Sequence, residues 1–287
     1  MDERSRMADS HNRNDINGED EPYTRVYAEI DLDAIRKNME AMRRVLPEKA
    51  KLIGVVKTDG YGHGAVPVAK AIASYVWGYA VAAVEEAKIL RRHRIQKPIL
   101  VLGSTHERHF RDLIEGEIRP AVFQEEKAAR LSKLAVSMGK RARIHIALDT
   151  GMSRIGFQAD EASLEAVCRI AAMPGIEIEG LFTHFSRADE TDKAFTRTQY
   201  GQYSRFIEAL RNRGVLIPIC HCANSAAIME LPQMGMDAAR AGISMYGLYP
   251  SEEVSRDMEL CPAMTVRSFI TFIKEIGDCL LYTSPSP

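Results

Sequence analysis

The most constraining feature of this sequence is a regular alternation of short apolar segments with longer segments of helical periodicity, which begins at Tyr27. Strands that alternate with amphipathic helices form parallel sheets joined by right-handed crossovers. After a lead-in strand at 28–32, eight segments have the composition of strands: 51–57, 78–82, 98–102, 120–123, 143–148, 176–183, 217–222 and 238–246. Most gaps hold an amphipathic helix, at 66–74, 84–93, 124–138, 161–173 and 199–213. Eight such units predict a (β/α)₈ barrel of the TIM type.

The first helix is expected to begin near Ala34, with Asp33 as its N-cap. An open, doubly wound sheet is the alternative architecture. It is disfavoured because no glycine-rich dinucleotide-binding turn follows the first strand. The length of 287 residues also agrees with a single barrel.

Composition excludes several classes of protein. Hydrophobic residues make up 46% and charged residues 27%, as in a soluble globular domain, and the net charge of −1 offers no field for nucleic acid or an anionic membrane. No apolar run is long enough for a membrane helix. Five cysteines without metal-ligand spacing indicate reduced thiols, no metal site and a cytoplasmic location. We expect a disordered tail at 1–22, a barrel at 23–255 and a further segment at 256–287.

Chemistry in a barrel of this type belongs at the carboxyl ends of the strands. The first barrel strand is expected to end at Lys57, within the segment VKTDGYGHG at 56–64. Desolvation at the barrel mouth would favour the neutral amine of Lys57, which can attack a carbonyl. The neighbouring glycines let backbone approach a ligand, and Tyr61 places a phenol beside it. A surface lysine is the structural alternative.

Other strand ends carry residues suited to anions. Arg154 lies in the loop DTGMSR at 149–154, where a guanidinium could hold a carboxylate, and His184 ends the sixth strand. Ser225 follows Asn224 and is expected to cap a helix at 226–231, whose start also suits an anion. Taken singly, each has an ordinary explanation: a surface arginine in an ion pair, a packed histidine or a helix cap.

The eighth strand contains Arg240, and Gly242 is expected to let its own N–H and that of Ile243 face a ligand. Barrels often build a phosphate site from the loops after strands seven and eight. An amine, a phosphate site and a carboxylate clamp around one mouth suit a phosphorylated aldehyde cofactor bound to Lys57 as a Schiff base, with an amino acid as substrate.

Five segments resemble, in order, those of the alanine racemase family, from about residue 23 to 262. They are the segment around Lys57 and the segments LDTGMSRIG at 148–156, THF at 183–185, HCANSA at 221–226 and RAGISMYGL at 240–248. Five segments in register make a chance match improbable. The resemblance implies a cytoplasmic, homodimeric isomerase that uses pyridoxal 5′-phosphate to interconvert L-alanine and D-alanine, supplying D-alanine for peptidoglycan.

The resemblance also implies roles for individual residues. Lys57 would carry the cofactor and transfer one proton, and Arg154 would hold the substrate carboxylate. Arg240 would face the pyridine nitrogen and leave it unprotonated, because a guanidinium cannot accept a proton. His184 would link Arg240 to the second catalytic base. The residues implied in cofactor binding are Lys57, Tyr61, His184, Asn224, Ser225, Arg240, Gly242 and Ile243.

The chain departs from the family pattern in two places. Ala147 stands where the family usually carries a carbamylated lysine that supports the carboxylate-binding arginine, so Arg154 needs another support. The family takes its second base, a tyrosine, from the partner subunit's C-terminal β domain. Residues 262–276 resemble the first strands of that domain, whereas 279–287 match no expected pattern, and Tyr282 is not assigned the role. We expect a truncated reading frame.

Three other functions stay open. A racemase of serine or of broad specificity would share all these motifs. A non-catalytic protein that binds pyridoxal phosphate would also share the barrel and Lys57. A Schiff-base aldolase would not need Arg240.

Overall fold

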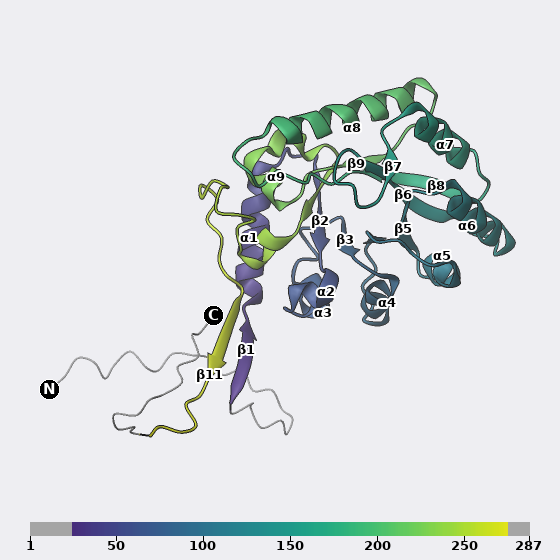
Figure 1. Ribbon diagram of the computed structural model, residues 1–287. Coiled ribbons are helices and arrows are strands. Elements are labelled where there is room, and N and C mark those ends of the chain that lie inside the picture. Colours follow the sequence, from purple (N-terminus) through teal and green to yellow (C-terminus); the bar gives the residue numbers. More distant parts are fainter. Residues whose placement is uncertain (1–24, 275–287) are drawn as a thin grey trace, which may run out of the picture. The chain divides into compact units, whose positions relative to one another are not determined.

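The computed structural model describes residues 25–274, which include an eight-stranded parallel barrel (Figure 1). The predicted tail at 1–22 and the aberrant segment at 279–287 lie outside the described residues. One compact unit spans Ile30–Met264 and contains the barrel. In the other unit, β1 (Val26–Ile30) pairs with β11 (Met264–Ser268) as a two-stranded sheet.

The barrel strands run in the order β10-β2-β3-β4-β5-β6-β8-β9, and each pairs in parallel with the next. Their bounds are β2 Lys51–Val55, β3 Gly78–Val81, β4 Ile99–Val101, β5 Ile118–Val122, β6 Ala142–Asp149, β8 Ile176–Phe182, β9 Ile219–His221 and β10 Ala238–Ala241. The ring closes between its two ends, because the Asp237 N–H donates to the Cys220 carbonyl and the Arg240 N–H to the Ala223 carbonyl. The predicted barrel class is therefore confirmed.

Helices cover the outside of the ring and connect successive strands (Figure 1). The α-helices are α1 Leu32–Val45, α2 Lys57–Tyr61, α3 Ala65–Ala71, α4 Val84–Arg92, α5 Phe110–Glu115, α6 Glu125–Ser137, α7 Glu161–Ala171, α8 Ala194–Asn212 and α9 Ser225–Glu230. Three 3₁₀ helices, η2 Glu107–His109, η3 Pro232–Gly235 and η4 Ile243–Tyr246, and a short strand β7, Phe157–Gln158, complete the described elements. No helix within residues 25–274 is long and apolar enough to cross a membrane.

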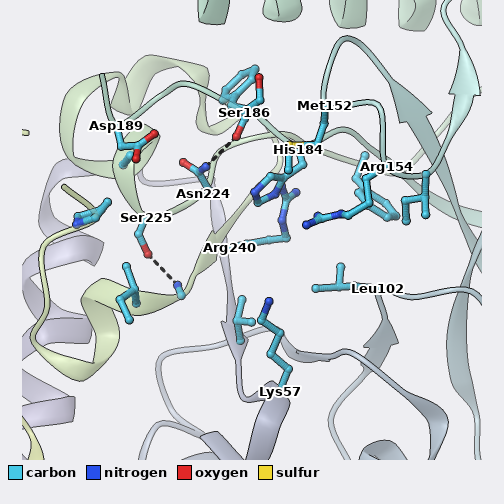
Figure 2. Close-up of a pocket in the computed structure, with 18 of the residues that line it drawn as sticks. Lys57, Leu102, Met152, Arg154, His184, Ser186, Asp189, Asn224, Ser225 and Arg240 are labelled. Atoms are coloured by element: carbon cyan, nitrogen blue, oxygen red, sulfur yellow. Dashed lines mark hydrogen bonds between the residues drawn. The ribbon is translucent and has the colours of Figure 1, made fainter. Parts of the chain in front are cut away.

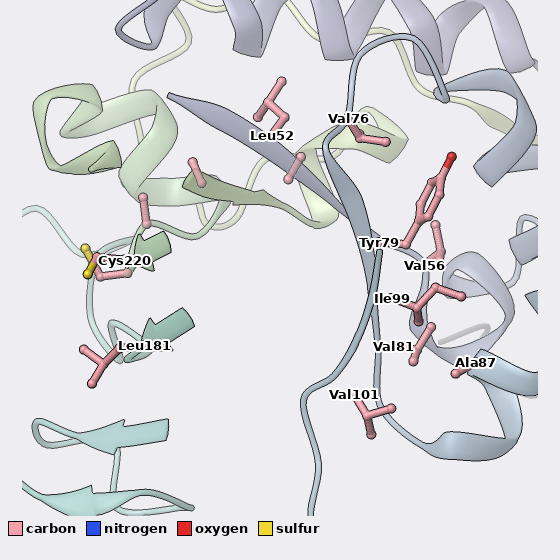
Figure 3. Packing of buried hydrophobic residues seen from close by; sticks show 14 of the residues in the cluster. Leu52, Val56, Val76, Tyr79, Val81, Ala87, Ile99, Val101, Leu181 and Cys220 are labelled. Atoms are coloured by element: carbon pink, nitrogen blue, oxygen red, sulfur yellow. The ribbon is translucent and has the colours of Figure 1, made fainter. Parts of the chain in front are cut away.

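Side chains alternate along each strand between the outside and the inside of the ring, so the core has an outer part against the helices and an inner part. On β2, Leu52 faces the helices and belongs to the large outer cluster, whereas Ile53 and Val55 point into the ring. Figure 3 shows part of the outer cluster, in which Tyr79, Val81 and Ile99 pack beside Ala87 of α4. Lys57 follows two residues after the end of β2 and lines the pocket at the mouth of the ring.

Several predicted boundaries need correction. Asp31, not Asp33, caps α1, because its carboxylate accepts from the N–H groups of Asp33 and Ala34. The eighth strand ends at Ala241, not at 246. The buried segment that follows Gly242 forms η4 instead. It was predicted as strand because a short, mostly apolar segment is equally compatible with a strand and with a buried helix. The lead-in strand lies two residues earlier than predicted, and α2, α5 and β7 were not anticipated.

Candidate functional site

A pocket with a volume of about 340 Å³ opens at the carboxyl ends of the barrel strands. That size is within the usual range for small-molecule sites. Three cationic side chains, Lys57, Arg154 and Arg240, point toward it from different sides (Figure 2). The remaining polar and apolar lining includes Tyr61, Leu102, Ala147, Met152, Ile155, Phe182, His184, Ser186, Asp189, Asn224, Ser225, Gly242 and Ile243.

Lys57 stands at the start of an unusual turn. Strand β2 ends at Val55, and the backbone then winds left-handed through Thr58, Asp59, Gly60 and Tyr61, with φ between 50° and 62°. Left-handed backbone costs roughly 1–2 kcal/mol for each non-glycine residue, so surrounding contacts must hold this turn. The turn brings the Lys57 Nζ to 5.6 Å from the centre of the Tyr61 ring.

Hydroxyl and amide groups from three segments meet on the opposite wall of the pocket. The Gly242 N–H donates to the Ser225 Oγ at 2.9 Å, instead of pointing freely at the pocket as expected. A Cβ built on Gly242 would lie 3.4 Å from the Ser225 Oγ and 3.7 Å from the Tyr61 hydroxyl oxygen, so the absent side chain leaves space between these two groups. Burial raises the pKa of Tyr61, and its phenol therefore keeps the proton that it can donate to an anion.

Asn224, not Ser225, is the N-cap of α9. The Asn224 Oδ1 accepts from the Ala227 N–H at 3.0 Å, and its Nδ2 donates to the Phe185 carbonyl at 3.2 Å. The prediction that Ser225 caps this helix was wrong. The Ser225 hydroxyl is consequently available to accept from Gly242 and to donate to a ligand.

Arg240 is buried without a carboxylate partner among the described residues. Its guanidinium donates to the carbonyls of Thr183 (2.8 Å), Cys222 (3.1 Å) and His221 (3.2 Å), and to two imidazole nitrogens. These nitrogens are His221 Nδ1 at 2.8 Å and His184 Nδ1 at 3.2 Å. Burial lowers the pKa of Arg240 to about 10, so the guanidinium remains a cation at neutral pH.

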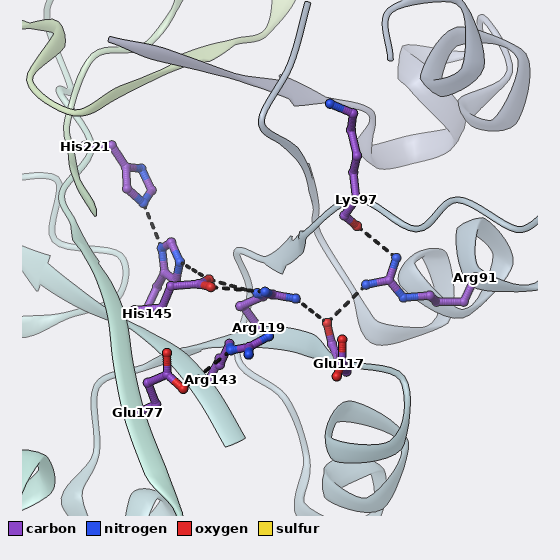
Figure 4. Close-up of polar contacts among 9 residues, drawn as sticks. Arg91, Lys97, Glu117, Arg119, Arg143, His145, Glu177 and His221 are labelled. Atoms are coloured by element: carbon purple, nitrogen blue, oxygen red, sulfur yellow. Dashed lines mark hydrogen bonds and ion pairs between the residues drawn. The ribbon is translucent and has the colours of Figure 1, made fainter. Parts of the chain in front are cut away.

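The contacts of Arg240 dictate the tautomers of a buried histidine pair. Figure 4 shows this pair, His221 and His145. A guanidinium only donates, so the His221 Nδ1 accepts and its Nε2 carries the proton. That Nε2 lies 3.0 Å from the His145 Nδ1, and the His145 Nε2 lies 3.3 Å from the Glu179 Oε2. Both histidines are therefore neutral, protonated on Nε2, and oriented from Arg240 toward Glu179. Burial lowers the pKa of each.

Glu179 lies beside a β-bulge and contacts His145 inside the ring. Ile144 pairs with Ile178, but His145 pairs with Gly180, so Glu179 is the extra residue on β8. Gly180 is required there because a Cβ would lie 2.4 Å from the His145 ring. Burial opposes ionisation of Glu179, but its hydrogen bonds with His145 and with Arg119 (2.8 and 3.0 Å) prevail and lower its pKa to about 2.

His184 and Arg154 lie on the opening side of the pocket. Burial, together with Arg240, Arg154 and Lys57, lowers the pKa of His184 to about 3. Its Nδ1 accepts from Arg240, so the neutral ring presents an Nε2–H. Arg154 is exposed and makes no ion pair within residues 25–274. Ala147 lies in an apolar cluster with Ala121 and Phe182, and this position therefore gives Arg154 no polar support.

The structure thus brings every residue predicted for the site to one pocket. Sequence reasoning missed His145, Glu179 and Arg119, which lie behind Arg240. A charged residue inside a buried apolar strand, such as Arg119, was the available signal. His221 belongs to the segment HCANSA, but its contact with Arg240 was not predicted.

This lining fits a ligand that carries a phosphate and a reactive carbonyl. The three cationic side chains can balance more than one negative charge on a ligand. The space beside Gly242 is bordered by the hydroxyl groups of Tyr61 and Ser225, which suit a phosphate. Lys57 supplies the amine at the other side of the pocket.

Comparisons with known proteins point to one family. The profile "Alanine racemase, N-terminal domain" matches residues 30–250. The chain is 45% identical over 255 residues to an alanine racemase of Clostridium perfringens, covering 88% of this chain and 66% of that protein. It is 42% identical to an alanine racemase of Desulforamulus reducens, covering 88% and 69%. The chain therefore spans about two thirds of the length of these relatives.

Solved structures show the same fold. A Clostridium difficile alanine racemase superposes with a TM-score of 0.85 at 41% identity, covering 86% of this chain and 65% of that one. A Bacillus anthracis alanine racemase with bound L-Ala-P gives a TM-score of 0.81 at 35% identity, covering 86% and 64%.

Proposed function

Since this chain belongs to the alanine racemase family, we propose that it binds pyridoxal 5′-phosphate on Lys57 and serves the interconversion of L-alanine and D-alanine. The observation that carries the proposal is the shared pocket of Lys57, the Tyr61 and Ser225 hydroxyls, and Arg240. Family membership also supports a homodimer, in which the partner subunit supplies the second base.

In this proposal the cofactor supplies an electron sink that makes the substrate α-proton acidic. The Lys57 amine would hold the cofactor by condensing with its carbonyl, with release of water, and would take up or return the proton at one face of the α-carbon. Tyr61, Ser225 and the Ile243 N–H hold the phosphate, with Gly242 providing the space and Asn224 fixing the start of α9. The Arg240 guanidinium can only donate, so it would leave a cofactor ring nitrogen that it contacts without a proton.

The substrate side of the pocket follows from charge and polarity. Arg154 reaches the opening from the loop after β6, where the Asp149 carboxylate accepts from the N–H groups of Gly151 and Ser153 and shapes the turn. A cation in that place suits an amino-acid carboxylate. The neutral His184, held by Arg240, is available as a donor between Arg240 and the second base.

Trapping the adduct tests the cofactor assignment. Purified protein is incubated with pyridoxal phosphate, reduced with borohydride and digested, and the modified peptide is identified by mass spectrometry. We expect the label on Lys57 and none in Lys57→Ala, whereas Lys51→Ala, at the other end of β2, stays labelled. Labelling that persists in Lys57→Ala would contradict the proposal.

Proton exchange tests the reaction. In deuterated water, a racemase exchanges the α-proton of alanine, and L-alanine and D-alanine are measured separately. Exchange of either enantiomer supports the proposal. Cofactor bound with no exchange of either would identify a carrier protein, and faster exchange with serine would identify a different substrate.

A further inference from the structure

Glu86, on α4, reaches the turn that carries Lys57. Its Oε2 accepts from the N–H groups of Ala82 (2.7 Å) and Ala83 (3.3 Å), at the end of β3. These contacts resemble half of a capping box at the start of α4. The Oε1, which a cap does not need, accepts from the Thr58 N–H at 2.6 Å.

The bond to Thr58 holds the first residue of the left-handed turn. Thr58, Asp59 and Tyr61 are non-glycine residues with positive φ, so the turn needs contacts that fix it. Asp59 fixes the far end, since its Oδ1 accepts from the Ala65 N–H at 2.7 Å. Glu86 fixes the near end, directly beside Lys57.

The handedness of this turn sets the distance between two groups of the site. Lys57 and Tyr61 begin and end the turn, and winding it left-handed brings the amine and the phenol ring together. Released from Glu86, Thr58 would relax toward ordinary backbone and move the amine relative to the phenol. Misplacement of a reacting group by about 1 Å can cost a hundredfold in rate.

We propose that Glu86 is a positioning residue: by holding the Thr58 N–H it sets the Lys57 amine at the right distance from the Tyr61 phenol for a ligand that carries both a carbonyl and a phosphate. This inference rests on the proposed function and adds to it a residue outside the pocket. A side-chain amide cannot replace the carboxylate, because its NH₂ end would face an N–H donor.

The test compares two aldehydes, pyridoxal phosphate and pyridoxal, which lacks the phosphate. The rate of adduct formation at Lys57 is measured with each, and the ratio of the two rates reports how well amine and phosphate site are aligned. Loss of folded protein lowers both rates equally and leaves the ratio unchanged. We expect Glu86→Gln to lower the ratio at least tenfold, and Glu86→Asp to lower it likewise, since the shorter carboxylate cannot reach both segments.

Glu85→Gln is the matched control. Glu85 is the preceding residue on the same helix, but its carboxylate is exposed and lies near His109. In Glu85→Gln the ratio of the two rates should stay within about twofold of the ratio in the unchanged protein. A ratio in Glu86→Gln equal to that of the control would overturn the inference. An unchanged protein that forms no adduct, or shows no preference for the phosphorylated aldehyde, would instead overturn the proposed function.

Discussion

At the residue scale, the exchange of roles between Asn224 and Ser225 frees a hydroxyl for ligand binding. Asn224 caps α9, so removing the Ser225 hydroxyl should weaken cofactor binding without loss of the cap. A hydrogen bond to a charged group is worth about 1.5–3 kcal/mol, or roughly ten- to a hundredfold in affinity. Titration of Ser225→Ala with pyridoxal phosphate measures this, with Ser186→Ala, another serine of the pocket, as control. Equal affinities of both variants would refute the role.

Glu179 and Glu177 are two carboxylates on one strand with opposite environments. The Glu179 side chain is only 14% exposed and contacts Arg119 and His145, whereas the Glu177 side chain is 40% exposed and pairs with Arg143 at 3.5 Å. Glu179→Gln leaves the buried Arg119 guanidinium without its carboxylate partner. This change should lower the free energy of unfolding by about 3–5 kcal/mol. Glu177→Gln should change it by less than about 1 kcal/mol. Urea unfolding of the two variants compares them directly, and a similar loss in both would disprove the assignment.

At the scale of elements, Asn38 connects α1 to segments more than 200 positions later. Its Nδ2 donates to the carbonyls of Met245 (3.1 Å) and Cys261 (2.8 Å), and its Oδ1 accepts from the Cys261 N–H at 2.8 Å. Asn38→Ala should lower the free energy of unfolding by roughly 1–3 kcal/mol, because the buried Met245 carbonyl loses its donor. Thermal or urea unfolding measures the loss. The neighbouring Lys37→Ala should be close to neutral, and a neutral Asn38→Ala would show that water replaces the amide.

Barrel strands were predictable from sequence because strands buried on both faces read as short apolar runs. Such a run says nothing of where the strand stops, and the η4 segment after Gly242 was consequently taken for strand. The left-handed turn after Lys57 could not be predicted either, since glycine accounts for only one of its four residues. Its handedness depends on Glu86, which lies outside the turn, and on the contact of Asp59 with the Ala65 N–H beyond it.

Most of the pocket lining was predictable because the barrel rule points to strand ends. The polar chain behind Arg240 was not, since its side chains come from different strands and meet only in the folded ring. In the segment IEIEGLF of β8, Glu177 and Glu179 both alternate with isoleucines of the outer cluster, and only the folded ring shows that Glu179 is the one that meets His145 and Arg119.

At the scale of the whole molecule, the buried histidines predict an acid-sensitive fold. Burial lowers the pKa of His145, His184 and His221 from the ordinary value of 6.5. Below about pH 6.5 the unfolded chain therefore binds more protons than the folded chain. The free energy of unfolding should therefore be highest above that pH. On acidification it should fall by roughly 1 kcal/mol per pH unit for each histidine. Below about pH 4.5, Glu179 adds a further loss as the pH approaches about 2.

Urea unfolding of the cofactor-free protein between about pH 7 and pH 5 measures this slope. His184→Asn should reduce it by about a third, whereas His93→Gln, which removes an exposed histidine, should leave it as it is. A free energy of unfolding that does not change over this range would rule out three neutral buried imidazoles.

The shared orientation of His221 and His145 limits proton transfer through the interior of the barrel. Each ring takes a hydrogen on one side and gives one on the other, so neither can flip without forcing its neighbour to flip too, and Arg240 cannot reverse at all. Because Arg240 cannot accept a proton, a proton that enters at the mouth of the barrel cannot pass along this row of side chains to Glu179.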